Sequence, residues 1–364
     1  METLRFARLW QSTRNLPYAL KVVVAIDSMK GCLSSREAGE AVQEAVLQSR
    51  PDAEVVCLPV SDGGEGFLDA IQPTGQWARI SLSVYDPLMR PVVADYLLSG
   101  HRAVIEMAQA SGLQLLKENE RNPFVATSYG TGQLIADSVQ HGAWEIIVGL
   151  GGSATSDCGR GVIQALEDAF GSLDAFNEVH FTIATDVENP LLGPDGAVYT
   201  FARQKGATEE MLPLLESRSE SFVTRCIQKQ GFDCSCKPGA GAAGGLGYAL
   251  MQFLGAERKS GCELMLDAAH IDTLLSDADL IITGEGHADR QTLMGKLPVG
   301  ILRRAQKFGI PTWLIAGKVS DADRLLAAGF SRVIQISPED MPLAEAMRPD
   351  VARRNIQAVM CEKV

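Results

Sequence analysis

The chain has 364 residues, of which 46% are hydrophobic and 21% are charged, and its formal net charge is −12. This length exceeds that of one typical domain and favours two or three domains with substantial buried cores. The acidic balance argues against a general nucleic-acid surface, which needs a basic stripe. An anionic ligand would therefore be held by local lysines or helix N-termini.

Residues 1–20 lack the continuous apolar core of a secretory signal, and we expect an N-terminal tail there. No apolar run reaches about 18 residues, so no membrane span is expected. The eight cysteines are scattered without a CxxC pair, which is typical of reduced thiols. These features predict a soluble cytoplasmic protein, and they permit a homodimer.

Short β-branched runs alternate with helical patterns along the chain. The strands expected in chain order are residues 21–26, 54–60, 80–85, 96–98, 103–106, 145–149, 179–185, 279–282, 312–316 and 332–336. A capping box of Ser34 and Glu37 opens the first helix. The helices expected are residues 35–48, 133–141, the stretch after GGSATSDCG to about 170, the stretch opened by 239–247 to about 253, and 298–308.

The terminal segments carry the cleaner strand–helix–strand pattern, whereas the middle of the chain is mixed. The pattern predicts an α/β fold in two domains with the active site in the cleft between them. Residues 21–66 and 278–364 are expected to form a discontinuous, Rossmann-like domain with a parallel sheet. Residues 67–277 are expected to form an inserted mixed α/β domain.

Five apolar strands end in polar, glycine-rich turns. Because ligands of open parallel sheets bind beyond the carboxyl ends of the strands, these turns are the candidate site. Their side chains are Asp27, Ser28 and Lys30, then Asp62 and Glu65, then Ser153, Thr155 and Asp157, then Asp186 and Asn189, and finally Glu285, Asp289 and Lys296.

Two glycine-rich segments precede expected helices, where bare backbone N–H groups can cradle phosphate. The candidate phosphate-binding residues are Gly151, Gly152, Ser153, Ala154, Thr155, Gly239, Gly241 and Gly244, with the lysines Lys205 and Lys296. Tight helix–sheet packing is the alternative reading of both segments. The GxGxxG match is weak because no apolar strand precedes it, and Walker A and protein-kinase motifs are absent.

Phosphoryl transfer needs positioned phosphates, a metal, cations and a group that orients the attacking hydroxyl. Asp186 follows an apolar strand and is the candidate general base, with Lys30 as its catalytic partner; a cap on the following turn is the alternative role for Asp186. Asp62, Glu65, Glu285 and Asp289 could bind Mg²⁺ or substrate hydroxyls. Our assignment places Asp27, Ser28, Asp62, Glu65, Asn189 and Asp289 at the substrate, and Glu285 and Asp157 at the metal.

Ten motifs that span nearly the whole chain after residue 20 resemble the bacterial glycerate kinase family, in the branch that usually makes 2-phosphoglycerate. They are DSMKGCLS (27–34), SDGGEGF (61–67), IEMAQASGL (105–113), TSYGTGQLI (127–135), GLGGSATSDCGRG (149–161), TDVENPLLGPDGA (185–197), QKGAT (204–208), PGAGAAGGLG (238–247), ITGEGHADRQTLMGK (282–296) and AGKVSD (316–321). The resemblance implies an ATP- and Mg²⁺-dependent kinase acting on D-glycerate, with Asp186 as a catalytic residue.

The chain also departs from the family pattern. Glu188 stands beside Asp186 where a threonine is common, Cys32 replaces a usual serine, and the connection 170–179 is short. Glu188 and the shortened connection motivate one competing hypothesis, a relative that binds ligand without turnover. A nicotinamide-dependent oxidoreductase using the GxGxxG match is the other competing hypothesis.

Overall fold

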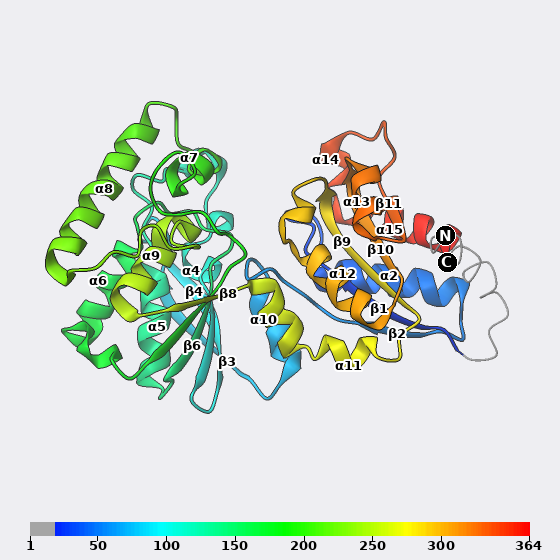
Figure 1. The fold of residues 1–364 in the computed structure, drawn as a ribbon, viewed down its shortest axis with the longest axis horizontal. Helices are drawn as coiled ribbons and strands as arrows, with labels where there is room; N and C mark the ends of the chain where they lie inside the picture. The colour runs from blue at the N-terminus through cyan, green and yellow to red at the C-terminus, as the bar shows by residue number, and fades with distance from the viewer. Residues whose placement is uncertain (1–18) are drawn as a thin grey trace. The chain divides into compact units, whose positions relative to one another are not determined.

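The computed structural model describes residues 19–364, so most of the predicted tail at residues 1–20 lies outside the described residues. The chain divides into two compact units (Figure 1). Unit 1 is Met1–Ser61 with Met265–Val364, and unit 2 is Asp62–Leu264. The boundaries proposed from the sequence, after residues 66 and 277, stay a prediction about independently folding domains, as does the cleft between them.

Unit 1 is built on a five-stranded sheet in the order β11-β10-β9-β1-β2, and all its strand pairs are parallel. The strands are β1 (Lys21–Ile26), β2 (Glu54–Cys57), β9 (Leu280–Ala288), β10 (Thr312–Val319) and β11 (Arg332–Gln335). The interior strand β1 is apolar throughout its buried part, as expected for a parallel strand covered on both faces.

Helices cover both faces of this sheet. Along β10, Trp313 and Ile315 belong to the cluster formed with α2 (Ser35–Ser49) and α15 (Pro349–Lys363), whereas Leu314 and Ala316 pack with α12 (Leu297–Phe308) and α13 (Ala322–Ala328). This alternation follows from the two-residue repeat of a strand. The shorter helices of unit 1 are α11 (Ile271–Leu275) and α14 (Leu343–Ala346), and α10 (Gly261–Ala268) runs across the boundary of the units. The predicted Ser34–Glu37 capping box is present at the start of α2.

Unit 2 contains a six-stranded mixed sheet in the order β3-β4-β5-β6-β7-β8. The strands are β3 (Ala78–Tyr85), β4 (Pro91–Ser99), β5 (Arg102–Glu106), β6 (Glu145–Gly149), β7 (His180–Ala184) and β8 (Glu257–Lys259). Strands β3 to β5 pair antiparallel, and β5 to β8 pair parallel. The helices are α3 (Phe67–Ile71), α4 (Ala108–Ser111), α5 (Tyr129–Gln140), α6 (Arg160–Phe170), α7 (Ala197–Phe201), α8 (Met211–Gln230) and α9 (Ala242–Leu254). The α/β class with one parallel and one mixed sheet is confirmed.

Two elements differ from the expectation, and one was missed. The segment 239–247 does not start a regular helix, because Ala243, Gly244 and Gly245 have left-handed backbone angles inside the first turns of α9. Glu285 lies within β9 rather than in a turn after it, since that strand continues to Ala288. The three-residue strand β8 was not predicted at all.

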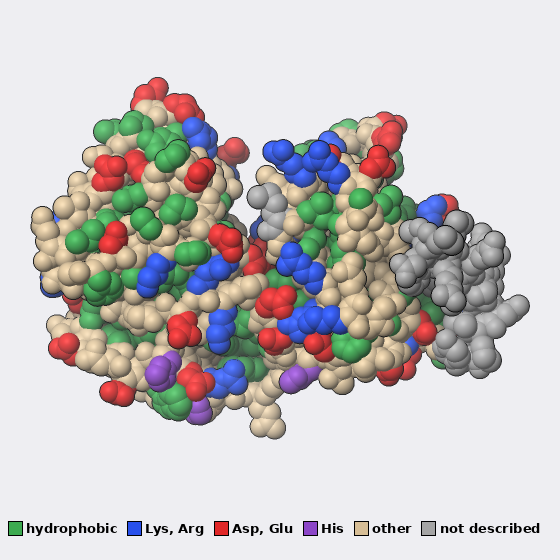
Figure 2. Space-filling view, viewed as in Figure 1, with side chains coloured by type: hydrophobic (Ala, Val, Ile, Leu, Met, Phe, Trp, Pro, Cys, Tyr) green, Lys and Arg blue, Asp and Glu red, His purple; other side chains and the backbone are tan. Residues whose placement is uncertain are grey.

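The surface of the view in Figure 2 carries acidic and basic side chains interspersed on both units. No helix among residues 19–364 is both long and apolar enough to cross a membrane.

Candidate active site

The parallel strands of unit 2 bring several candidate residues to one edge of its sheet. Glu106 at the end of β5 is in register with Gly149 of β6, which is in register with Ala184 of β7, which in turn faces Lys259 of β8. The segments that follow these strands carry Ser153, Asp157, Asp186 and Ser260. Parallel pairing therefore gathers loops that lie far apart in the sequence.

Glycines let the turn after β2 approach this edge closely. The Gly151 N–H donates to Gly63 O at 3.1 Å. A Cβ at Gly151 would lie 2.3 Å from Gly64 Cα, and one at Gly63, whose φ is +90°, would lie 2.8 Å from Ala184 O. A side chain at either position would push apart the loops that carry Asp62, Ser153 and Asp186.

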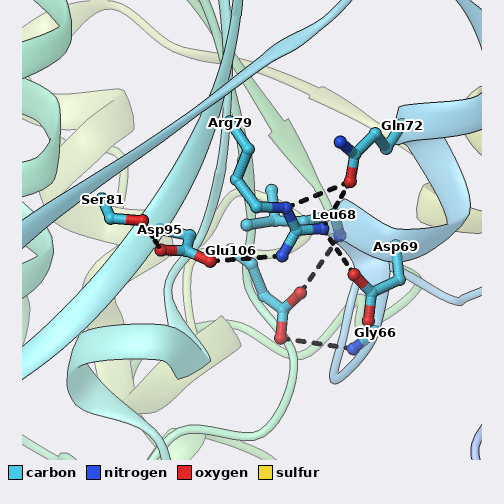
Figure 3. A network of polar contacts seen from close by, with 8 residues as sticks. All are labelled: Gly66, Leu68, Asp69, Gln72, Arg79, Ser81, Asp95 and Glu106. Carbon is cyan, nitrogen blue, oxygen red and sulfur yellow. Dashed lines mark hydrogen bonds and ion pairs between the residues drawn. The ribbon is translucent and has the colours of Figure 1, made fainter.

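Glu106 fixes the far end of the same turn (Figure 3). Its carboxylate is 1% exposed and accepts hydrogen bonds from the Gly66 N–H at 3.3 Å and the Leu68 N–H at 3.1 Å. Burial raises the pKa of Glu106 to about 7, although these two bonds oppose the rise. The adjoining exposed cluster joins Arg79 to Asp69, Asp95 and Gln72. Glu106 thus connects the sheet to the loop that holds Asp62 and Glu65.

Lys205 lies behind the 151–155 loop. Its side chain is fully enclosed, and Nζ donates to Ser153 Oγ at 2.6 Å and to Thr155 O at 2.7 Å. Burial lowers the pKa of Lys205 to about 7, while the charge of Asp157 acts in the opposite direction. These contacts indicate that Lys205 braces the loop from the protein side.

The loop itself already uses part of its backbone. The Ala154 N–H donates to Ser111 O at 2.9 Å, and the Gly151 N–H is bonded to Gly63 O as described above. The predicted phosphate binding by this segment therefore relies on Gly152, Ser153 and Thr155 more than on Gly151 and Ala154.

The glycines of the 238–247 segment serve close packing in this structure. A Cβ at Gly241 would lie 2.3 Å from Pro190 O, and one at Gly244 would lie 1.9 Å from Thr155 O. The Gly241 N–H also donates to Asn189 O at 2.9 Å. Gly239 has a positive φ of 87° and lies against the Arg258 side chain. This interlocking supports the packing alternative, and phosphate binding by Gly239, Gly241 and Gly244 stays a prediction.

Asp157 is surrounded by donors. Its carboxylate accepts the Ser128 N–H and hydroxyl, both at 2.9 Å, the Gly159 N–H at 3.0 Å and the Gly161 N–H at 3.1 Å. The residue is 5% exposed. Because Mg²⁺ would have to displace these donors, the contacts favour a role in shaping the loop. The assignment of Asp157 to a metal stays a prediction.

Asp186 follows β7 and is half-buried. Its Oδ1 accepts the Ser260 hydroxyl at 2.5 Å, and its Oδ2 accepts the Cys262 N–H at 3.2 Å. Burial raises the pKa of Asp186, and the nearby Asp62 carboxylate adds to the rise, whereas the two hydrogen bonds oppose it. A carboxylate with a raised pKa is a better proton acceptor for an alcohol than an ordinary exposed one.

The neighbours of Asp186 explain two other sequence features. The Glu188 side chain, which departs from the family pattern, is 75% exposed and pairs with Arg258 at 3.1 Å. Asn189 Nδ2 donates to Asp195 O at 2.8 Å and so stabilises the turn after the aspartate. Asp62 Oδ1 accepts the Gly64 N–H at 3.0 Å, and Glu65 is exposed.

Unit 1 carries the remaining candidates at the ends of β1 and β9. The Ser28 N–H donates to Asp27 Oδ1 at 2.8 Å, while the buried Ser28 Oγ has no hydrogen-bond partner within residues 19–364. Lys30 is exposed in the following turn.

Within β9, Glu285 accepts the Thr292 hydroxyl at 2.6 Å and the Lys296 ammonium at 3.1 Å. Asp289 Oδ1 accepts the Gln291 N–H at 2.7 Å and closes the same turn. Among residues 19–364 no group of three His, Cys, Asp or Glu side chains is arranged to hold a metal ion.

Ser260 and Glu106 were not among the site residues predicted from the sequence. Ser260 follows a strand of only three residues, which is too short to show a periodic pattern. Glu106 ends a predicted strand inside the IEMAQASGL motif, and its position before a helix was the available signal.

Two α/β units whose parallel strands end in glycine-rich turns lined by carboxylates and lysines define an enzyme that acts on a small polar substrate. The chain belongs to the glycerate kinase family, whose model matches residues 22–175 and 169–362. It is 40% identical to glycerate 2-kinase of Escherichia coli (strain K12), with 94% of this chain and 98% of that protein covered. It is 38% identical to glycerate kinase of Bacillus subtilis (strain 168), with 90% and 93% covered.

The fold of this chain also matches that of a solved structure from the same family. A crystal structure of a Salmonella typhimurium LT2 protein assigned as glycerate kinase 2 is 36% identical and matches with a TM-score of 0.76. The match covers 95% of this chain and 97% of that chain.

Proposed function

We propose that this protein is a glycerate kinase that transfers the γ-phosphoryl group of ATP to a hydroxyl of D-glycerate and makes 2-phosphoglycerate. The proposal is supported by the chain's membership of the family. It is also supported by the names of two relatives, since the matches cover nearly the full length of each relative and of this chain. The single observation that carries the chemistry is the half-buried Asp186 carboxylate with a raised pKa at the end of β7.

In the proposed reaction the substrate hydroxyl oxygen attacks the γ-phosphorus, and the bond from that phosphorus to the ADP oxygen breaks. The hydroxyl proton passes to the Asp186 carboxylate. Asp62 and Glu65 in the neighbouring loop, and Asn189 in the turn after Asp186, are the proposed substrate-binding residues of unit 2. Asp27, Ser28 and Asp289 are those of unit 1, and Lys30 is its proposed catalytic cation.

ATP is the expected co-substrate, and Gly152, Ser153, Thr155 and Lys296 are its proposed phosphate-binding residues. Lys205 contributes by holding the loop, since its ammonium group already bonds to Ser153 and Thr155. Mg²⁺, when bound to the nucleotide, would neutralise charge on the phosphate oxygens. Asp157 and Glu285 stay the predicted metal ligands, and an ion there would have to displace protein donors that each carboxylate now accepts.

The two competing hypotheses receive less support. The GxGxxG segment has left-handed residues and no preceding strand, whereas dinucleotide binding needs a strand, a tight turn and a helix. For an inactive relative, the extra charge of Glu188 was one of two motives, beside the short connection 170–179, and the ion pair of Glu188 with Arg258 offsets that charge.

A coupled ADP-release assay across small hydroxy acids, with and without Mg²⁺, tests the proposal, and phosphorus NMR of the product identifies the phosphorylated hydroxyl. We expect turnover with D-glycerate. We expect Asp186→Asn to lower kcat by a factor on the order of 10² or more, as for a lost general base. Asp195→Asn, an exposed aspartate in the same turn, is the matched control.

Binding of D-glycerate without ADP release would support the inactive relative, and binding of NADH without binding of ATP would support the oxidoreductase. An Asp186→Asn variant with the kcat of the wild type would remove Asp186 from the mechanism.

A further inference from the structure

The segment that leaves β8 reaches the carboxylate of Asp186. Ala184 of β7 is in register with Lys259 of β8, and the Thr185 N–H donates to Lys259 O at 3.1 Å. Continuing both strands by one or two residues places Ser260 next to Asp186. The backbone ladder, rather than a flexible loop, therefore sets this contact.

The hydroxyl of Ser260 is oriented by a second bond. Ser260 Oγ accepts the Glu263 N–H at 3.2 Å and lies 2.5 Å from Asp186 Oδ1. A hydroxyl has a single hydrogen, so with a lone pair committed to Glu263 the hydrogen is directed at Asp186. The Cys262 N–H, at 3.2 Å from Oδ2, fixes the other carboxylate oxygen.

Gly261, which lies between Ser260 and Cys262 in the chain, packs closely against the Asp62 backbone. A Cβ at Gly261 would lie 2.2 Å from Asp62 O and 2.7 Å from Asp62 C, a contact that only glycine permits. The same three residues thus determine where Asp62 lies and how Asp186 is turned. The charge of Asp62 in turn helps to raise the pKa of Asp186.

We propose that Ser260 is a positioning residue that orients the Asp186 carboxylate toward the substrate hydroxyl, with Gly261 setting the spacing between Asp186 and Asp62. This inference rests on the proposed function. Neither residue touches the reacting atoms: Ser260 acts through Asp186, and Gly261 acts through the backbone of Asp62. A general base works only when its oxygen is held in line with the proton that it removes.

The charged groups around Asp186 set its pKa and therefore the pH at which it takes up a proton. Asp62 raises its pKa, Arg258 of β8 lowers it, and Glu188 is paired with that arginine; the Cys262 thiol is buried. The Ser260 bond lowers the pKa of Asp186, so removing the hydroxyl raises that pKa further. The acid limb of the kcat profile is then expected to move to higher pH.

The test compares Ser260→Ala, Ser260→Thr and Gly261→Ala with the wild type in steady-state kinetics across pH. We expect Ser260→Ala to lower kcat roughly 10-fold to 100-fold, as for a misaligned catalytic group, with little change in the KM for ATP. Ser260→Thr retains the hydroxyl and should recover most of kcat and the wild-type acid limb. Gly261→Ala should lower kcat while leaving the Ser260 hydroxyl in place. Ser276→Ala, which removes an exposed hydroxyl bonded to Thr273 O, is the matched control.

The outcomes separate this inference from the proposed function. If Asp186→Asn loses kcat but Ser260→Ala keeps both the kcat and the acid limb of the wild type, the role of Ser260 is overturned and that of Asp186 stands. If Asp186→Asn keeps its kcat, both roles are overturned. Equal losses in Ser260→Ala and Ser260→Thr would also contradict the inference, because the hydroxyl would then not be the group that matters.

Discussion

Two aspartates at neighbouring strand ends of unit 2 have opposite surroundings. Asp157, after β6, accepts four hydrogen bonds, from the amide and hydroxyl of Ser128 and the amides of Gly159 and Gly161. Asp186, after β7, accepts two and also feels the charge of Asp62. Both positions appear alike in the sequence, since each aspartate follows an apolar strand and stands near glycine or asparagine turns.

The difference lies in how each carboxylate is solvated by the protein. Four donors replace the water that Asp157 loses on burial, so its charge stabilises the loop. Asp186 receives only two such donors, so burial makes its charged form less favourable and raises its pKa. A count of donors in the fold, rather than the residue type, distinguishes a structural carboxylate from a candidate base.

Exchanging each aspartate for asparagine should separate the two roles most strongly. Asp157→Asn turns an NH₂ group toward N–H donors and should lower the free energy of unfolding by about 2–4 kcal/mol. Asp186→Asn removes a charge whose burial is unfavourable, so its stability at neutral pH should equal or exceed that of the wild type. Urea unfolding of both variants provides the measurement. Equal destabilisation by the two substitutions would contradict the contrast.

Lys205 extends the comparison to a buried cation beside Asp157. Its pKa is about 7 in the folded protein and is lowered from 10.5, so the unfolded chain binds more protons between these values and stability rises with pH there. Relative to Lys205→Met, the wild type should gain about 2 kcal/mol of unfolding free energy between pH 7 and pH 9. Urea unfolding of both proteins at the two pH values measures this. A difference that stays constant would mean that Lys205 keeps its proton.

Glu106 should show the opposite pH dependence. Its pKa is raised from 4.5 to about 7 by burial, so the folded protein binds more protons in this window and stability falls as pH rises through it. Relative to Glu106→Gln, the wild type should lose about 1.5 kcal/mol between pH 5.5 and pH 7. The slope of the difference, rather than its absolute size, is the test, since glutamine also disturbs the bonds to Gly66 and Leu68.

Much of the fold could be predicted because its strongest elements are local. The apolar run of β1 and the Ser34–Glu37 capping box need no tertiary context to be recognised. Strand β8 and the left-handed turn at Ala243–Gly245 could not be predicted in the same way. Strand β8 is held by its pairing with β7, and the turn packs against Thr155 and Leu191, all of which are distant in the sequence.

The residues of the candidate site also fall into those that local sequence identifies and those that depend on tertiary contacts. Strand ends identify Asp186 and Asp157 as candidates, because parallel strands deliver such residues to one edge. The sequence does not state that Lys205 is enclosed or that Ser260 donates to Asp186, since both facts depend on how loops interlock. Glycines that suggest a phosphate cradle, such as Gly241 and Gly244, meet backbone atoms of neighbouring loops instead.

The smallest expected effect concerns the ion pair next to Asp186. Glu188 is 75% exposed and Arg258 is 24% exposed, and an exposed partner limits the energy of such a pair. Glu188→Gln should change the free energy of unfolding by less than about 1 kcal/mol. It also leaves the Arg258 charge unopposed, which should lower the pKa of Asp186 and move the acid limb of kcat slightly to lower pH, opposite to the shift expected for Ser260→Ala. Arg258→Leu is the control with the reverse sign, because it removes a charge that favours ionised Asp186. If both substitutions moved the limb in the same direction, the pair would not act on Asp186 through its charge.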